Sequence, residues 1–141
     1  MDKLPVMNSI TSTSSYLKKH SRRKNNITIK FIAGNQSLNR NDEFLYTLLV
    51  PDRARTLFPC FEQPNLKATF SLRLDIPTEW KAVSNTYITK EETKGNCKTV
   101  TFAPTEPLST YLFSFVTGKL EHQEYIEGNR KISAILPRNR F

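Results

Sequence analysis

The stretch Thr69-Phe-Ser-Leu-Arg-Leu-Asp-Ile76 places its apolar residues at every second position. A two-residue period of this kind is typical of a β-strand that buries one face and exposes the other. It predicts a strand over residues 68–76. Pro77 has no N–H to donate to a neighbouring strand and is expected to end it. Residues 53–67 lead into this strand as a loop that contains two prolines.

Short segments of similar kind, separated by turn residues, continue along the rest of the chain. Gly95-Asn96 and Gly128-Asn129 suit tight hairpin turns. The apolar run 44–50 predicts a strand buried on both faces, and 62–66 is expected to form a single helical turn. Further extended segments are expected at 27–31, 80–83, 86–89, 98–103, 111–117, 121–125 and 131–136. This spacing predicts an all-β fold, built as an antiparallel sandwich or a saddle-like sheet.

The bulk properties favour one soluble domain. The length of 141 residues is enough for a single domain, and 24% of the residues are charged. No window approaches the ~18 apolar residues that a membrane helix requires. The first residues are too polar for the apolar region of a signal peptide. A cytoplasmic location is therefore the default expectation, which a signal segment upstream of this sequence would overturn.

The net charge of +8 is concentrated at the amino terminus. Residues 1–25 hold six basic side chains and one acidic one, whereas residues 26–141 hold fifteen basic and twelve acidic ones. Few large apolar residues occur before residue 26, so we expect 1–25 to be a flexible basic leader, or a frayed helix around 14–24. A patch for nucleic acid or a membrane surface is the functional alternative.

Cys60 and Cys97 are the only cysteines. Two cysteines cannot supply a four-thiolate zinc site, and neither has a second cysteine at the C-x-x-C spacing. Cys60 is expected to act as a small buried apolar residue. A Cys60–Cys97 disulfide is the alternative, and nothing in the sequence implies the oxidising compartment that it would need.

Catalytic zinc needs three protein ligands and an open coordination position. The only histidines are His20 and His122, and the segment 121–124 does not hold two histidines one helical turn apart. The sequence therefore predicts no catalytic residue and no metal ligand in this chain.

Two other patterns favour structural roles. Ser109 and Thr110 would need His122 as a base, and no glycine elbow flanks them, so a Ser/His nucleophile is rejected. The aromatic residues Tyr111, Phe113 and Phe115 could stack nucleic-acid bases. An alternating aromatic strand in a sandwich more often belongs to the core, and we expect that role here.

The loop and strand of residues 53–70 resemble a family signature. Arg53-Ala-Arg-Thr-Leu-Phe-Pro-Cys-Phe-Glu-Gln-Pro-Asn-Leu-Lys-Ala-Thr-Phe70 is similar to D-A-R-R-x-F-P-C-[FW]-D-E-P-x-x-K-A-x-F of the aminopeptidase N family of zinc peptidases, the gluzincins. Trp80-Lys-Ala-Val-Ser-Asn85 resembles the family segment W-x-A-x-S-N. The segment 107–118 resembles M-S-T-Y-L-x-A-F-x-x-G. The strands before the signature are also similar, so the resemblance spans about residues 26–136.

In that family, the signature lies in an amino-terminal β domain that packs on a thermolysin-like zinc domain and closes one wall of the active-site cavity. The zinc-domain motifs G-[AG]-M-E-N and H-E-x-x-H do not occur in this sequence. The resemblance implies a non-catalytic part of a zinc aminopeptidase, inactive alone. Zinc is expected in the full-length parent, and no cofactor is expected in this chain. The implied partners are the missing zinc domain and, through the parent, a peptide; no membrane or nucleic-acid partner is expected.

The resemblance also divides the chain. It implies a leader (1–25), a partial aminopeptidase N-like β domain (26–137) truncated before residue 27, and a tail (138–141). Two other functions stay open, namely a stand-alone β interaction module and a basic nucleic-acid-binding module.

Five residues form the structural signature, namely Arg55, Pro59, Cys60, Glu62 and Pro64. Arg55 is expected to pair with a carboxylate and fix the loop. Glu62 stands where the family has Asp and is expected to act in a turn or cap. A general base at this position would need a nucleophile or metal nearby, and the sequence offers neither.

Leu48 and Val50 stand where the family has Gln and Glu or Gln, side chains that help to hold the free α-amine of the substrate. Neither aliphatic side chain can accept a hydrogen bond, so no substrate-binding residue carries over to this chain. Either the amine is recognised differently, or Leu48 and Val50 belong to the core, which is the role we expect.

Overall fold

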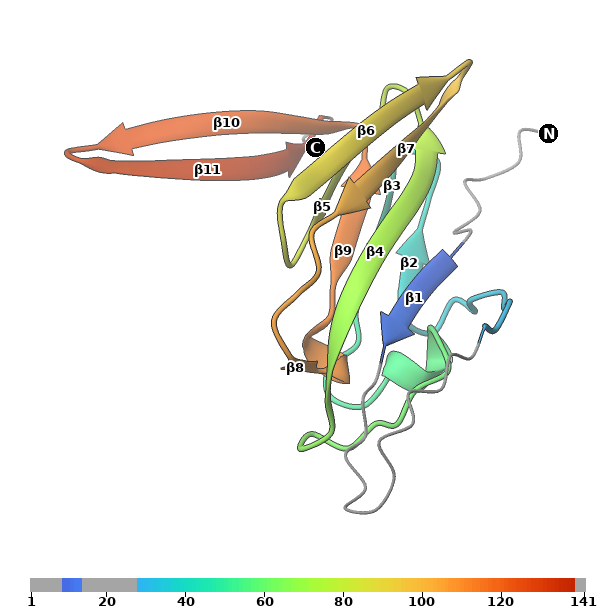
Figure 1. Ribbon diagram of the computed structural model, residues 1–141. Helices are drawn as coiled ribbons and strands as arrows, with labels where there is room; N and C mark the ends of the chain where they lie inside the picture. The colour runs from blue at the N-terminus through green and yellow to red at the C-terminus, as the bar shows by residue number, and fades with distance from the viewer. Residues whose placement is uncertain (1–8, 14–27, 139–141) are drawn as a thin grey trace.

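The computed structural model describes residues 9–13 and 28–138, which are built almost entirely of β-strands (Figure 1). The elements are β1 (Ser9–Thr13), β2 (Leu38–Arg40), β3 (Phe44–Thr47), a 3-10 turn η1 (Ala54–Thr56), β4 (Lys67–Pro77), β5 (Lys81–Ser84), β6 (Ile88–Lys94), β7 (Cys97–Phe102), β8 (Leu108–Ser109), a 3-10 turn η2 (Thr110–Leu112), β9 (Phe115–Gly118), β10 (Leu120–Glu127) and β11 (Arg130–Pro137). No described helix has the length and apolar character needed to cross a membrane.

The strands form two main sheets and a separate hairpin. The first sheet has the order β1-β4-β7-β6, with the short β8 paired to the start of β4. The second has the order β2-β3-β9-β5, and β10 pairs with β11. All of these pairs are antiparallel, and the buried side chains of both main sheets belong to one core cluster. The predicted all-β, antiparallel sandwich is confirmed.

Strand β4 has the one-sided burial that its sequence predicts. Phe70, Leu72, Leu74 and Ile76 are each at most 3% exposed, whereas the residues between them face outward or are half-buried. Each such side chain stabilises the fold by about 1.5–3 kcal/mol when it leaves water. On β7, Val100 and Phe102 are buried too, and so β4 and β7 supply much of the first sheet's inner face.

An aromatic cluster joins the two sheets. Phe70 on β4 stacks on Phe113, which precedes β9, with ring centroids 4.6 Å apart. Phe58, from the loop after η1, meets both rings edge-on at 5.8 Å. Phe113 and Phe115 are buried as core residues, whereas Tyr111 is half-buried. The core role expected for this aromatic pattern is confirmed for Phe113 and Phe115.

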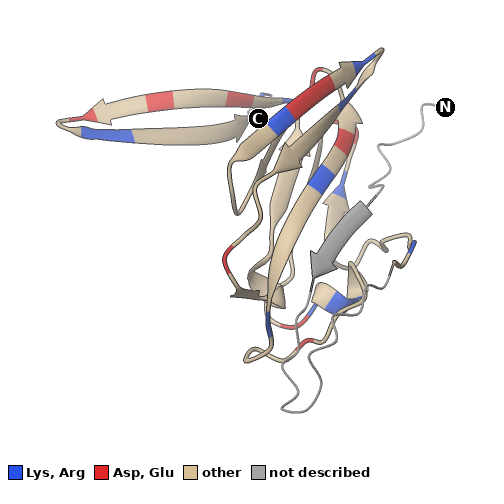
Figure 2. Cartoon of the chain, in the orientation of Figure 1, with Lys and Arg blue, Asp and Glu red and all other residues tan. Residues whose placement is uncertain are grey.

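The hairpin β10–β11 extends away from the sandwich (Figure 1). Its turn is made by Gly128, which has a φ of 58°, and Gly95 turns β6 into β7 with a φ of 61°. These left-handed values suit glycine, as the two predicted turns require. Acidic residues lie on β10 and basic ones on β11 (Figure 2), and Glu124 pairs with Lys131 at 2.8 Å.

The amino-terminal prediction needs correction. Residues 9–13, expected to be part of a flexible leader, form strand β1, which pairs with residues 69–73 of β4. The helix suggested at 14–24 lies outside the described residues. The strand expected at 27–31 is absent from residues 28–31, where Ile29 is 52% exposed.

Two further segments differ from expectation. The strand predicted at 111–117 begins only at Phe115, after η2. Asn85 accounts for this, because its side chain donates to Leu112 O at 3.0 Å and accepts from Ser114 N–H at 2.8 Å, taking the place of a neighbouring strand. No helical turn forms at 62–66, where the chain is a loop with a turn at Pro64-Asn65. The carboxylate of Glu62 accepts the N–H of Ala54 and so caps η1.

Candidate functional site

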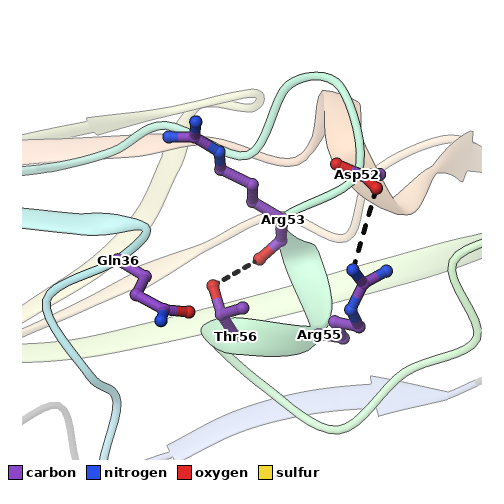
Figure 3. A pocket seen from close by; sticks show the side chains of 5 residues that line it. All are labelled: Gln36, Asp52, Arg53, Arg55 and Thr56. Carbon is purple, nitrogen blue, oxygen red and sulfur yellow. Dashed lines mark hydrogen bonds and ion pairs between the residues drawn. The ribbon is translucent and has the colours of Figure 1, made fainter.

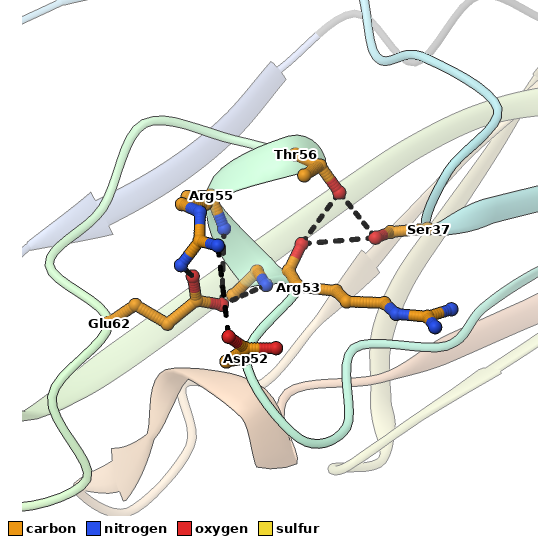
Figure 4. A network of polar contacts seen from close by, with 7 residues as sticks. Ser37, Asp52, Arg53, Arg55, Thr56 and Glu62 are labelled. Atoms are coloured by element: carbon orange, nitrogen blue, oxygen red, sulfur yellow. Dashed lines mark hydrogen bonds and ion pairs between the residues drawn. The ribbon is translucent and has the colours of Figure 1, made fainter.

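The loop between β3 and β4 is organised around the carboxylate of Glu62 (Figure 4). This side chain is 7% exposed. Its Oε1 accepts the backbone N–H of Ala54, and the N–H of Arg55 at 3.4 Å. Its Oε2 accepts from Arg55 Nη1 at 2.8 Å. The carboxylate therefore caps η1 and neutralises Arg55 together, so the expected carboxylate partner of Arg55 and the expected cap role of Glu62 are both present.

The other signature residues surround this cap. Cys60 packs partly against the core, and burial is the main reason that the pKa of its thiol rises from 9.0 to about 11; Glu62 raises this pKa further, and Arg55 acts in the opposite direction. Pro59 is exposed beside it. The carbonyl of Pro64 accepts the Ser109 hydroxyl at 2.6 Å, which ties the loop to β8. Cys60 and Cys97 are both free thiols, so no disulfide joins them.

A second polar network fixes the start of the same loop (Figure 4). The carbonyl oxygen of Arg53 lies 3.0 Å from Ser37 Oγ and 2.8 Å from Thr56 Oγ1, and the two hydroxyls also contact each other. Each hydroxyl has one proton, so two of these three hydrogen bonds form at a time. Ser37 is fully buried. A buried hydroxyl stays stable only with partners, and this network holds the segment before β2 against the signature loop.

A polar pocket opens beside this network (Figure 3). It is lined by Gln36, Asp52, Arg53, Arg55 and Thr56, and we call it the arginine pocket. Arg55 Nη2 lies 3.7 Å from Asp52 Oδ2 on one side, while Arg53 and Gln36 lie on the other (Figure 3). The pocket therefore combines positive and negative groups near the surface.

An exposed apolar strip is formed by Tyr46 of β3 and by Leu48 and Val50, which follow this strand. These side chains are 38%, 48% and 55% exposed, whereas Thr47 and Leu49 between them are buried. The core role expected for Leu48 and Val50 is therefore wrong, and so is the prediction that 44–50 is buried on both faces. The run is apolar on both sides, but among the described residues only its inner side is covered.

A shallow groove continues this apolar surface toward the hairpin. It is lined by Phe44 and Tyr46 of β3, Val116 of β9, Leu120 of β10 and Ile135 of β11, and we call it the apolar groove. Apolar surface that is left exposed is a common sign of an interaction site. The strip and the groove share Tyr46, so they form one continuous apolar region.

The residues weighed for catalysis have separate partners. Ser109 donates to Pro64 O, and His122 Nδ1 lies 3.9 Å from Glu124 Oε1 within β10. Thr110 is buried in η2. In the part of the chain that the structure describes, no three His, Cys, Asp or Glu side chains gather as they would to hold a metal ion.

Comparison with known proteins gives the family. The family model described as "Peptidase M1 N-terminal domain" matches residues 13–112, which is most of the chain. The chain belongs to this family. The match contains β2 to β8 and the whole signature loop, and it agrees with the resemblance drawn from the sequence.

Curated relatives of this M1 N-terminal domain are aminopeptidases. Aminopeptidase M1 of Arabidopsis thaliana is 40% identical over 78 residues, which are 55% of this chain and 9% of that protein. Glutamyl aminopeptidase of Rattus norvegicus is 47% identical over 66 residues, or 46% of this chain and 7% of that protein. The chain thus spans less than a tenth of the length of these relatives.

Solved structures share the fold of this M1 N-terminal domain. An M1 zinc metallopeptidase from Deinococcus radiodurans superposes with a TM-score of 0.57 at 24% identity, over 70% of this chain and 23% of that chain. Its E323A mutant gives a TM-score of 0.54 at 26% identity, over 65% of this chain and 22% of that chain.

Sequence reasoning missed four contributors to the site. Tyr46 belongs to the run 44–50 that the sequence predicts to be buried on both faces, and its exposure follows only from the sheet order. Ser37 and Gln36 carry no signal in the sequence, since their roles depend on a loop that returns from far along the chain. Arg53 had a signal, because it stands where the signature has Asp.

Proposed function

We propose that residues 9–137 form the amino-terminal domain of a zinc aminopeptidase, where they make one wall of the peptide-binding cavity and pack on the zinc domain. The observation that carries this proposal is the apolar strip, because Leu48 and Val50 are exposed at the positions where the family contacts the substrate amine. Exposure at these positions is what a cavity wall requires. If Leu48 and Val50 were buried in the core, their side chains could not contact a peptide in the cavity.

The apolar groove supports a packing role beside the cavity. Phe44, Val116 and Leu120 are largely buried around Tyr46, which is 38% exposed. Removing such surface from water contributes about 25 cal/mol per Å². The curated relative from Arabidopsis thaliana is more than ten times as long as the matched stretch, so a large partner within the same protein is the occupant that we assign to the groove.

Zinc does not fit the described residues of this chain, which offer no group of three ligands. In the proposed function, the zinc domain of the parent supplies all protein ligands. The role of this chain is to shape the cavity, to exclude water beside the peptide and to orient the peptide's amino-terminal residue.

Leu48 and Val50 change how the wall would meet the peptide. An ammonium group gains little from an aliphatic side chain, and burying it without an acceptor is costly. We therefore propose that this wall contacts the side chain of the amino-terminal residue through apolar surface. The ammonium group would be held by the zinc domain alone.

A chimera tests this function. Residues 9–137, which include β1, replace the corresponding domain of the plant aminopeptidase M1, and hydrolysis of leucine p-nitroanilide is measured. The chimera should be active with a raised KM, because the amine contacts are missing. L48Q together with V50E should lower KM at least about tenfold, since a charge-assisted hydrogen bond contributes about 1.5–3 kcal/mol.

The matched control is Y87E, which changes an exposed aromatic residue next to the first sheet. This variant should leave KM unchanged. An unchanged KM in the doubly substituted chimera, with kcat and folding intact, would contradict the proposed place of Leu48 and Val50 in the cavity wall.

A further inference from the structure

The hairpin β10–β11 is a two-stranded sheet on its own. Its strands pair along their whole length, and within residues 9–13 and 28–138 no other strand pairs with either of them. The hairpin extends away from the sandwich (Figure 1), and its Tyr125 and Ile132 are 57% and 49% exposed. An isolated two-stranded hairpin is only marginally stable in water, and further strands stabilise it. The hairpin therefore gains stability from a strand that joins one of its edges.

The two outer edges of the hairpin differ in charge. β10 carries an exposed glutamate at every third position, namely Glu121, Glu124 and Glu127. Charged side chains of this kind discourage another strand from pairing with an edge. β11 instead contains the uncharged run 132–136, Ile-Ser-Ala-Ile-Leu. Short uncharged runs of β-forming residues pair readily with other strands, so the outer edge of β11 is the open one.

The backbone of β11 presents N–H groups to this outer edge at odd-numbered positions. In an antiparallel pair, alternate residues point their N–H groups toward the neighbouring strand and away from it. Arg138 N–H donates to Lys119 O at 2.9 Å, which continues the β10–β11 register, so the even-numbered residues of β11 face β10. The N–H groups of Lys131, Ser133 and Ile135 therefore face outward. Position 137 offers no donor there, because proline lacks an N–H.

We propose that the outer edge of β11 pairs with β11 of a second copy of this chain, antiparallel and about a two-fold axis at Ser133. The two hairpins then form one continuous sheet in the order β10-β11-β11-β10. In this register Ser133 lies opposite the partner's Ser133, and Lys131 lies opposite the partner's Ile135. Each of these positions exchanges backbone hydrogen bonds with the residue opposite. The proline at 137 lies beyond the paired stretch.

The edge is complementary to itself in this register. The two copies of Lys131 lie at opposite ends of the pairing, so they do not face each other, and each stays 2.8 Å from Glu124 of its own hairpin. Ile132 lies opposite the partner's Ala134, which places apolar side chains together. A two-fold contact uses both β11 edges, so association stops at a dimer. The proposal does not depend on the proposed function, because it involves no residue of the apolar strip.

Sedimentation equilibrium of the 141-residue chain tests this pairing. We expect a reversible dimer with a Kd of about 10–100 µM, because an edge contact is much smaller than a standard protein interface. S133P removes the central outward N–H and keeps the donors that face β10, so it should raise the Kd at least about tenfold. The matched control is I126P, which places a proline at an outward-facing position of β10 and should leave the Kd unchanged.

Disulfide trapping tests the register. With Cys60 and Cys97 replaced by serine, S133C should form a disulfide-linked dimer when glutathione disulfide is supplied as the oxidant. I135C should not, because the two copies of position 135 are about 13 Å apart along the strands, too far for a disulfide. A chain that stays monomeric, a Kd that S133P leaves unchanged, or equal trapping of S133C and I135C would overturn the proposal.

Discussion

A single buried carboxylate decides the shape of the signature loop. Glu62 satisfies two backbone N–H groups of η1 and one guanidinium, and these three donors come from residues seven or eight positions earlier. The resemblance of residues 53–70 to the family signature predicts that Arg55 pairs with a carboxylate. It does not say which carboxylate, since Asp52 and Glu62 are both within reach along the chain.

Removing Glu62 should be costly, and removing Asp52 should not. E62A leaves the N–H of Ala54 without its acceptor, and the free energy of unfolding should fall by about 2–4 kcal/mol. D52N removes only an exposed contact at 3.7 Å and should cost less than about 0.5 kcal/mol. Urea unfolding followed by tryptophan fluorescence measures both. Equal losses in the two variants would show that Glu62 is not the cap of this loop.

The thiol of Cys60 should react slowly below pH 10. Burial raises its pKa from 9.0 to about 11, and only the thiolate is alkylated. In C97S, the iodoacetamide rate should therefore still rise about tenfold per pH unit between pH 8 and 10. A plateau near pH 9 would refute the raised pKa. C60S, which leaves the exposed Cys97, serves as the control.

The same shift affects stability with a definite sign. The folded state holds the Cys60 proton more tightly than the unfolded state, because its pKa is the higher one. The resulting stabilisation is fully present below pH 9 and is lost as the pH rises through about 11. Urea unfolding at pH 8 and pH 10.5 should show a smaller pH effect in C60S than in C97S.

At the scale of elements, burial periodicity predicts strands well when both neighbours of a strand are themselves strands. β4 was predicted within one residue at each end, since β1 and β7 flank it and its inner face is covered. The segment 111–117 was predicted too long, because Asn85 replaces the neighbouring strand over its first half. The prediction that residues 44–50 are buried on both faces is wrong, because apolar composition does not show which face of a strand is covered by another layer.

The contact of β9 with β3 depends on Gly118. A Cβ at this position would lie 2.5 Å from Glu43 O and 2.7 Å from Phe44 Cβ, and the backbone there cannot move aside without breaking the ladder. G118A should lower the free energy of unfolding by about 1–3 kcal/mol. G34A is the control, because nothing lies within 4 Å of the added methyl group. A G118A protein as stable as G34A would mean that the two strands are further apart.

At the scale of the whole molecule, the sandwich has one apolar face that the described residues, 9–13 and 28–138, leave uncovered. The apolar strip and the apolar groove adjoin β3, and sequence alone predicted burial on both faces only for residues 44–50 of this region. The family could be predicted from the sequence, because its signature is one continuous stretch of residues. The uncovered face could not be predicted, because the exposure of its residues depends on the strand order β2-β3-β9-β5. Family membership and this uncovered face together lead to the proposed place of the domain in a larger enzyme.

The most direct test is whether the uncovered face binds a zinc domain. The chain is mixed with the zinc domain of a related aminopeptidase that lacks its own amino-terminal domain, and association is followed by sedimentation velocity. We predict a one-to-one complex that Y46E weakens at least about tenfold and that Y87E leaves intact, since burying an uncompensated charge in an interface costs several kcal/mol. The absence of a complex, or equal weakening by the two variants, would contradict the account.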